Sequence, residues 1–277
     1  MNVNDGTGIC HGIVFRLIYD MEFFWICGTT FIASGLTLFS CFGLGTILMP
    51  VVAIFLPVPV AIAITAIVHL MSKIFKLLLF WRSVDSRILV TFGLPAMAAA
   101  IPGAFLLGYL SQLHGLGSYG LFGSQHVIYP VKLVAGLLLI LFATAEQVPF
   151  LKNNAFLRMG MPAGGLLSGF FGGLTGHQGA FRSAFLVQGN LSEKSFVATN
   201  AAVAVLVDAT RLIIYGVTFD IALVQAQAGL VTAAVIFSFV GVMLAAELLK
   251  KVTIRFIQIV VAVMMYALGL LLCTGLI

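Results

Sequence analysis

A short polar stretch interrupts a long apolar run in the second half of the chain. It consists of Gly176-His177-Gln178-Gly179 and is followed by Arg182. Glycines allow the backbone to unwind, and a helix that restarts after them begins with free N–H groups and the positive end of its dipole. His177 and Gln178 add side-chain donors, and the planar guanidinium of Arg182 suits a small oxyanion. The pattern predicts an anion-binding site. Two alternatives remain open: Arg182 extends to the surface or pairs with an acid, and His177 only caps the new helix.

A second glycine-rich break occurs in the first half of the chain, at Gly43-Leu44-Gly45-Thr46. A helix that starts after Gly45 would again expose free N–H groups, with Thr46 as a capping residue. Broken helix inside a membrane persists only where it is buried in protein or lines a cavity. Two such helix starts that converge on the centre of the membrane would bind one anion between them.

Polar residues also occur early in the helices predicted after each break, namely Thr65 after the first and Thr199 and Asn200 after the second. We expect their hydroxyl and amide groups to donate hydrogen bonds to the same anion. Hydrogen bonding between neighbouring helices is the alternative interpretation, and it stays open.

Two further groups of ionisable residues fall inside apolar stretches, where charge is costly and usually functional. Asp208 and Arg211 are three residues apart and are predicted to form an ion pair on one helix face. His69, Lys73 and Lys76 share one face of an earlier helix, with Lys76 expected to extend to the inner surface. Asp208 and His69 are the candidates for carrying a coupled proton, although Arg211 would hold Asp208 ionised.

The sequence offers no catalytic or metal-binding pattern. It contains no His-Glu-x-x-His pair, no pair of candidate catalytic aspartates and no Ser or Cys with an evident base, and its four cysteines form no Cys-x-x-Cys motif. We therefore expect neither enzymatic activity, nor a metal, nor a cofactor.

The composition excludes a soluble protein. Apolar residues make up 61% of the chain, charged residues only 8%, and the mean hydropathy is +1.16. A soluble domain of this length needs roughly three times that charge to cover its surface, whereas lipid-facing helices need none. There is no basic run of the kind that binds nucleic acid. The expected partners are the lipid bilayer, a small anion and, as a coupled ion, the proton.

Eight apolar stretches follow one another with short loops between them, which is typical of a helical membrane protein that crosses the bilayer several times. They span residues 22–56, 58–80, 88–112, 127–145, 159–191, 195–216, 224–249 and 254–276.

Loop charges orient these stretches. Lys and Arg follow the second, fourth and seventh stretches, which predicts that these three loops are cytoplasmic. The loop after the fourth stretch is therefore inside, whereas the loop at Asp220 contains no Lys or Arg and is expected outside. The stretches 159–191 and 195–216 lie between these two loops, and two full spans would return the chain to the inside. The stretch 159–191 is also too long for one simple span and is broken by glycines. We interpret it as a re-entrant hairpin from the cytoplasmic side, and 22–56 as its mirror image from outside. Eight ordinary spans are the alternative.

The fold predicted from these observations is an all-α polytopic membrane protein with two inverted repeats, each a glycine-broken hairpin plus three transmembrane helices. An N-terminal segment, 1–21, precedes the first repeat, 22–146. A cytoplasmic linker, 147–158, leads to the second repeat, 159–277. Both termini are expected outside, and a homodimer is a further expectation.

The chain resembles the TauE/SafE family of sulfite and anion exporters. Gly43 through Pro50 is similar to the family's first repeat, and three segments are similar to its second: 168–186, 196–199 and 206–212. The resemblance covers about residues 25–275. It implies an inner-membrane exporter of sulfite or an organosulfonate, without a cofactor.

This chain departs from the family's pattern at two positions. Gly176-His177-Gln178-Gly179 replaces a run of three glycines, and Arg182 stands where many members are apolar. Both changes favour an anionic substrate. An anion channel, or an importer of another oxyanion, is the alternative function within transport.

Overall fold

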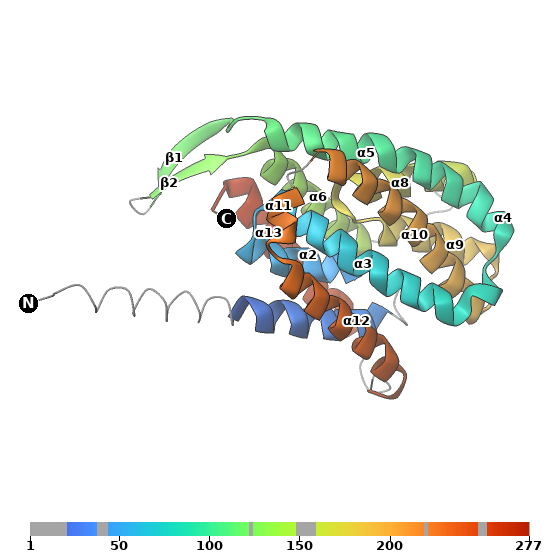
Figure 1. Ribbon diagram of the computed structural model, residues 1–277. Helices are drawn as coiled ribbons and strands as arrows, with labels where there is room; N and C mark the ends of the chain where they lie inside the picture. The colour runs from blue at the N-terminus through green and yellow to red at the C-terminus, as the bar shows by residue number, and fades with distance from the viewer. Residues whose placement is uncertain are drawn as a thin grey trace, which may run out of the picture.

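The computed structural model describes residues 21–37, 44–121, 124–147, 159–218, 221–248 and 254–276, and most of these residues are helical (Figure 1). The predicted N-terminal segment 1–21 and linker 147–158 lie almost entirely outside the described residues. The helices are 21–37, α2 (Leu44–Phe55), α3 (Val58–Phe80), α4 (Ser86–Ile88), α5 (Leu94–Gln112), α6 (Pro130–Gln147), α8 (Gly160–Thr175), α9 (Gly179–Leu186), α10 (Glu193–Thr218), α11 (Ile221–Gln225), α12 (Ala228–Leu248) and α13 (Ile254–Thr274). Short 3-10 turns cover Trp81–Ser83 and Val187–Gly189, and a π-helical segment, Leu89–Gly93, joins α4 to α5.

Three continuous helical segments within the described ranges are long and apolar enough to cross a membrane: Val58–Ser83, Ser86–Gln112 and Glu193–Thr218. Shorter apolar segments occur in the other three helices for which spans are predicted, namely Pro130–Ala145 of α6, Ala228–Leu244 of α12 and Ala262–Thr274 of α13. Each of the six predicted spans therefore corresponds to an apolar helix, which supports the prediction of a helical membrane protein. Helix α3 begins and ends at the predicted residues.

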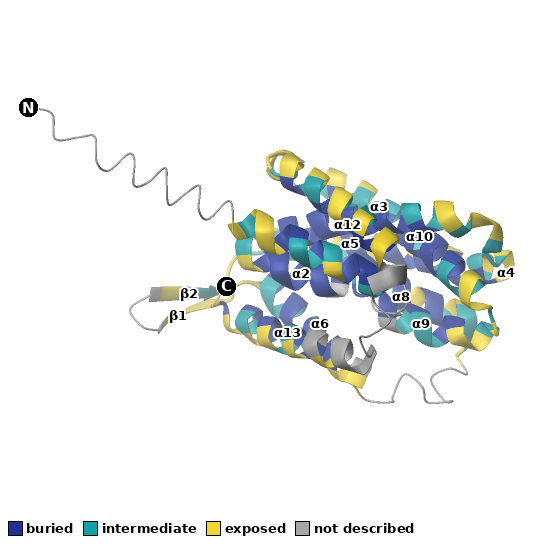
Figure 2. Cartoon of the chain, turned by 90° about the horizontal axis from the view of Figure 1, so that it is seen from below, coloured by how far each residue is buried: buried dark blue, intermediate teal, exposed yellow. Residues whose placement is uncertain are grey.

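The outer surface of the bundle is apolar. Buried residues fill its interior and exposed residues lie outward along the helices (Figure 2). Large apolar side chains are among the exposed ones, including Leu78, Ile213, Val217, Met243 and Val263. An apolar exterior is stable where hydrocarbon replaces water as the solvent.

A small β-hairpin departs from the all-α prediction. Strand β1 (Gly117–Leu121) pairs antiparallel with β2 (Ser124–Ile128), and Tyr119 lies opposite His126. The hairpin projects from the bundle between α5 and α6 (Figure 1). The apolar stretch predicted to begin at residue 127 therefore begins with the end of a strand, because the local Val and Ile residues suit a strand as well as a helix.

Helices α8 and α9 form an antiparallel hairpin. Gly164 on α8 lies against the ring of Phe185 on α9, and the Ser168 hydroxyl donates a hydrogen bond over 3.2 Å to the carbonyl of Gln178. The turn between the helices is buried, with Gln178 only 1% exposed. The long apolar stretch 159–191 is therefore two short helices that fold back on each other.

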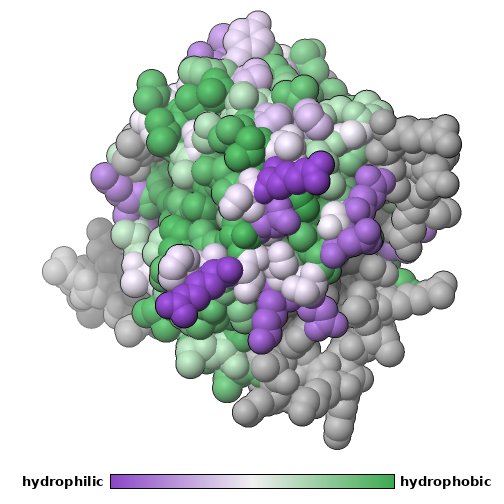
Figure 3. All heavy atoms as spheres, turned by 90° about the vertical axis from the view of Figure 1, so that its right-hand side faces the viewer, coloured by the Kyte–Doolittle hydropathy of each residue, from purple (hydrophilic) through white to green (hydrophobic). Residues whose placement is uncertain are grey.

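Both arms of the α8–α9 hairpin reach the same end of the bundle. Gly165 near the start of α8 lies against Phe92, and Gly189 after α9 lies against Ile88. Exposed Arg87 and Lys194 also belong to the segments at this end. Hydrophilic side chains gather on this end of the molecule (Figure 3). The hairpin thus enters and leaves on one side, which is the geometry expected of a re-entrant segment.

Glycines allow the closest helix contacts. Gly165, Gly169 and Gly173 of α8 lie directly against the backbone carbonyls of Phe92, Ala96 and Ala100 in the π-helical segment and α5. Side chains at these positions would overlap the neighbouring backbone, so small residues are required.

Two glycines make a similar pair of contacts elsewhere. Gly103 of α5 lies against the carbonyl of Phe170 in α8, and Gly241 of α12 lies against the carbonyl of Phe31 in helix 21–37. In each case a helix for which a span is predicted packs against the helix that precedes a glycine break.

Candidate functional site

The second break is built from a left-handed glycine. Gly176 has φ +83° and ends α8, with its N–H donating to Gly172 over 3.0 Å. The chain turns through His177 and Gln178, and α9 starts at Gly179. The first main-chain bond of the new helix runs from the Arg182 N–H to the Gln178 carbonyl over 3.1 Å. A helix start therefore lies inside the protein, as the glycine pattern predicts.

The two glycine breaks are neighbours in space. A Cβ atom on Gly45, near the start of α2, would lie 3.6 Å from the Thr65 methyl group and 3.8 Å from the Gly176 carbonyl oxygen. The structure thus brings together Gly45, Thr65 and the turn of the second hairpin. Gly43 lies outside the described residues, as does the side chain of Thr46.

Asp208 is the centre of a buried polar network. Its Oδ2 accepts a hydrogen bond from His69 Nδ1 over 2.5 Å, and its Oδ1 accepts from Arg211 Nη2 over 2.8 Å and from Gln178 Nε2 over 3.2 Å. Asp208 is fully buried, and its three partners are at most 2% exposed. The predicted pair of Asp208 and Arg211 is present, and it joins α3, the hairpin turn and α10 through one carboxylate.

Arg211 also fixes the end of α8. Its Nη1 donates to the Gly172 carbonyl over 3.3 Å, and one turn along α10 the Tyr215 hydroxyl donates to the Gly173 carbonyl over 2.5 Å. These carbonyls belong to the last turn of α8, where intrahelical partners run out. Tyr215 was not a predicted site residue, although its spacing of four from Arg211 implies the same helix face.

Arg182 is buried beside α10. Its Nε donates a hydrogen bond to the side-chain oxygen of Asn200, a neutral acceptor, and the arginine side chain is 1% exposed. Arg182 therefore does not extend to the surface, and the structure brings it together with one of the two predicted polar residues of α10.

His177 lies at the tip of the hairpin against α6. Its ring stacks on Phe142 with centroids 5.7 Å apart, and its Nδ1 shares a 3.1 Å hydrogen bond with the Thr175 hydroxyl. Its Nε2 is buried and has no hydrogen-bond partner in the described part of the chain, and the same is true of the Thr65 hydroxyl. The region around the two breaks thus contains polar atoms available to a ligand.

Thr199 has a different environment. Its hydroxyl accepts a hydrogen bond from the Asp85 N–H over 2.9 Å, and the Asp85 carboxylate in turn accepts from the N–H of Ile88. Thr199 therefore fixes the loop between α3 and α4, so the structure does not bring it to the turn of the hairpin. This contact links residues far apart in sequence, and no local pattern could have indicated it.

The lysine face of α3 differs from its prediction. Lys76 does not extend to the inner surface, since it is 1% exposed, and Lys73 is 3% exposed. The Lys76 ammonium donates to the Thr37 hydroxyl over 2.9 Å and to the Ser34 carbonyl over 3.3 Å. The oxygens at the end of helix 21–37 give this cation buried acceptors, which removes the need to reach water.

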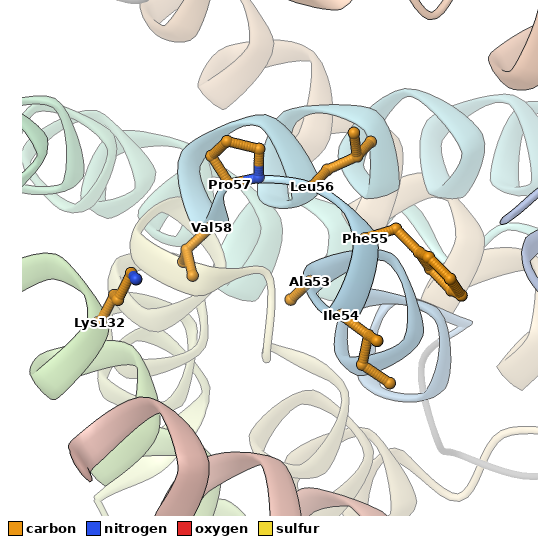
Figure 4. A pocket seen from close by; sticks show the side chains of 7 residues that line it. All are labelled: Ala53, Ile54, Phe55, Leu56, Pro57, Val58 and Lys132. Atoms are coloured by element: carbon orange, nitrogen blue, oxygen red, sulfur yellow. The ribbon is translucent and has the colours of Figure 1, made fainter. Parts of the chain in front are cut away.

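A cavity of about 180 Å³ lies away from this polar network, at the turn from α2 to α3 (Figure 4). It is lined by Ala53 through Val58 and by Lys132 of α6. The other residues that line it have apolar side chains, and Lys132 is the one lining residue with a charged side chain.

The family comparison agrees with the architecture. The family model described as "Sulfite exporter TauE/SafE" matches residues 26–272, nearly the whole chain. The chain belongs to the TauE/SafE family. Searches of curated proteins and of solved structures gave no match.

Membership in the TauE/SafE family confirms the resemblance found in the sequence, and together with the apolar helices it makes this chain a multi-pass membrane transport protein. The family description implies a small anionic substrate. Within the described ranges of this TauE/SafE protein, no three His, Cys, Asp or Glu side chains are grouped to hold a metal ion.

Proposed function

We propose that this chain is a secondary transporter that exports a small anion, sulfite or a related organosulfonate, across the inner membrane. The observation that carries the proposal is an excess of basic over acidic side chains in the buried interior. Among the described residues the buried Lys, Arg, Asp and Glu side chains are four basic ones, Lys73, Lys76, Arg182 and Arg211, and one carboxylate, Asp208. Basic side chains are costly to bury inside an apolar bundle, and a bound anion offsets that cost.

The proposed substrate site is the region where the two breaks meet. The start of α9 at Gly179 supplies free N–H groups, and the nearby Arg182 supplies a guanidinium held by Asn200. The hydroxyl of Thr65 and the Nε2 of His177 are buried polar atoms without hydrogen-bond partners in the described residues.

The first break completes the proposed site. Gly43, Gly45 and Thr46 would supply the opposite helix start. Thr199 is left out of this set, because its contact with the Asp85 N–H places its hydroxyl at the loop between α3 and α4.

An inverted repeat is part of the proposal. Its support is the matched packing of Gly103 on Phe170 and of Gly241 on Phe31. Gly241 follows Gly103 by 138 residues and Phe170 follows Phe31 by 139, so the two contacts join corresponding positions of the two halves. In each half a spanning helix packs on the hairpin of the other half. Such an exchange is what a pseudo-two-fold axis in the membrane plane requires.

We infer that the Asp208 network couples transport to protons. His69 is the member of the network whose ring can be neutral or protonated, and its Nδ1 donates directly to Asp208. Asp208 also accepts from Gln178 at the hairpin turn. A proton gained or lost at His69 would therefore change the bonds that hold the turn, and through them the anion site.

Transport by the purified protein in proteoliposomes tests the proposal. We expect sulfite or a small sulfonate to accumulate against its gradient when a pH gradient is imposed, and we expect no accumulation in protein-free liposomes. Flux that only runs downhill and ignores the pH gradient would indicate a channel. Absence of flux for sulfite, sulfate and a sulfonate alike would refute anion transport.

A further inference from the structure

A buried polar face of α3 extends from the Asp208 network toward the hydrophilic end of the bundle. His69, Ser72, Lys73 and Lys76 follow one another at intervals that keep them on one helix face, and all four are at most 3% exposed. The rise of a helix separates Lys76 from His69 by about 10 Å. Lys76 lies on the side of His69 nearer the end of α3 that leads to Arg82, and so nearer the hydrophilic end of the bundle (Figure 3).

Within the described residues, the Lys76 ammonium has only neutral oxygens as hydrogen-bond partners, the Ser34 carbonyl and the Thr37 hydroxyl. No carboxylate among the described residues forms an ion pair with Lys76. The residues that follow Thr37 up to the start of α2 include neither Asp nor Glu. A buried ammonium whose partners in the described residues are neutral favours the binding of an anion from outside the chain.

Two hydroxyls without partners belong to the same region. Ser72 and Ser238 are buried at 1% and 0% exposure, and the hydroxyl of each lacks a hydrogen-bond partner in the described ranges. Ser72 lies one turn before Lys76 on α3.

Ser238 belongs to α12, which packs on α3 where Phe75 and Phe239 stack with centroids 4.8 Å apart. One turn further along α12, Gly241 lies against Ser34, the residue whose carbonyl accepts from Lys76. The two hydroxyls and the ammonium thus come from helices that meet at one junction.

We propose that Lys76, Ser72 and Ser238 form a second anion-binding site at the junction of α3, α12 and helix 21–37. It would take a small oxyanion of the class carried at the central site, through one ammonium and two hydroxyl donors. This inference rests on the proposed function, because the second site would hold an anion between the hydrophilic end of the bundle and the two breaks. The competing explanation is that Lys76 only stabilises the end of helix 21–37.

Counting bound anions separates these explanations. Equilibrium binding of radiolabelled sulfite to the full chain in detergent should show two anions per wild-type protein. Lys76→Gln should bind one, Lys76→Arg should keep both, and Arg182→Ala should retain only the anion at the Lys76 site. The Ser72→Ala and Ser238→Ala double variant should weaken the second site about tenfold or more, since it removes two hydrogen bonds to a charged group.

Thr30→Val is the matched control, because it removes a buried hydroxyl of helix 21–37 that already donates to the Ile26 carbonyl over 2.7 Å. It should bind both anions with wild-type affinity. If Lys76→Gln, or the double serine variant where Lys76→Gln does not fold, binds both anions as tightly as the wild type, the second site is refuted. A wild-type protein that binds a single anion, lost in Arg182→Ala and kept in Lys76→Gln, also refutes it while the central site stands. Loss of an anion in Lys76→Gln with full binding by Arg182→Ala supports the second site and refutes the central one.

Discussion

The two glycine breaks lie side by side, but their chemistry differs. The turn of the second break is held by side chains, because Gln178 bonds to Asp208 and Arg211 bonds to Gly172. The helix after it contains Arg182, whereas α2 after the first break contains no ionisable residue. The first break contributes backbone and no charged side chain in the described residues of α2. Two halves with a similar arrangement of helices can therefore differ in chemistry. Here the buried charged residues around the junction belong mainly to the second half.

Removal of the carboxylate at the centre of the second break should have the largest effect. Asp208→Asn leaves Arg211 buried without its counter-charge and weakens the bonds to His69 and Gln178. We expect a loss of about 3–5 kcal/mol in the free energy of unfolding, and a weaker response of transport to an imposed pH gradient. Thermal unfolding in detergent and proteoliposome flux measure the two. If Asp208→Asn has wild-type stability and an unchanged pH response, Asp208 neither stabilises the network nor takes part in proton coupling.

The glycines of the two breaks should differ in their tolerance of a side chain. A Cβ on Gly176 would lie 2.5 Å from Arg211 Nη1, and its φ of +83° disfavours any other residue. Gly176→Ala should therefore cost about 2–3 kcal/mol. Gly45→Ala meets only ordinary contacts and should change stability by less than about 1 kcal/mol. Equal losses at the two positions would contradict the distinction between the breaks.

Substitutions at the two matched glycine contacts should lower stability by similar amounts. Such a result would show that the two halves share their helix packing although their charged residues differ. Gly103→Ala and Gly241→Ala each force a methyl group against a backbone carbonyl, that of Phe170 or that of Phe31. Each should lower the unfolding free energy by about 1–3 kcal/mol, and by similar amounts. Gly28→Ala, at a helical position where a Cβ meets nothing within 4 Å, is the control and should raise the unfolding free energy by up to about 1 kcal/mol. A loss at only one of the two positions would argue against matched repeats.

A cysteine substituted for Glu193 tests the predicted topology, and it is expected to leave transport unchanged. Glu193 is exposed at the start of α10, after the second hairpin. A single cysteine there, in a background without other cysteines, should react with an impermeant reagent from the cytoplasmic side. Labelling only from outside would show that the second hairpin is a full span, and it would refute the inverted repeat.

Local patterns predicted the parts of the structure that local physics determines. The bounds of α3, the break after Gly176 and the pairing of Asp208 with Arg211 follow from apolar runs, glycine and helical spacing. Long-range contacts were not predictable. Nothing local indicates that Thr199 accepts from Asp85, or that helix 21–37 offers acceptors that keep Lys76 buried.

Anion binding by Arg182 variants tests the central claim most directly, with sulfite, sulfate and a sulfonate titrated into the purified protein by calorimetry. Arg182→Ala should abolish binding at the site where the breaks meet, and Arg182→Lys should recover only part of it, because a point charge replaces a planar fork. Arg87→Ala is the matched control, since Arg87 is exposed at the end of the bundle, and it should bind as the wild type does. Both arginine-to-alanine variants should express. If Arg182→Ala binds the same anions with wild-type affinity and stoichiometry, Arg182 is a structural residue and the anion site lies elsewhere.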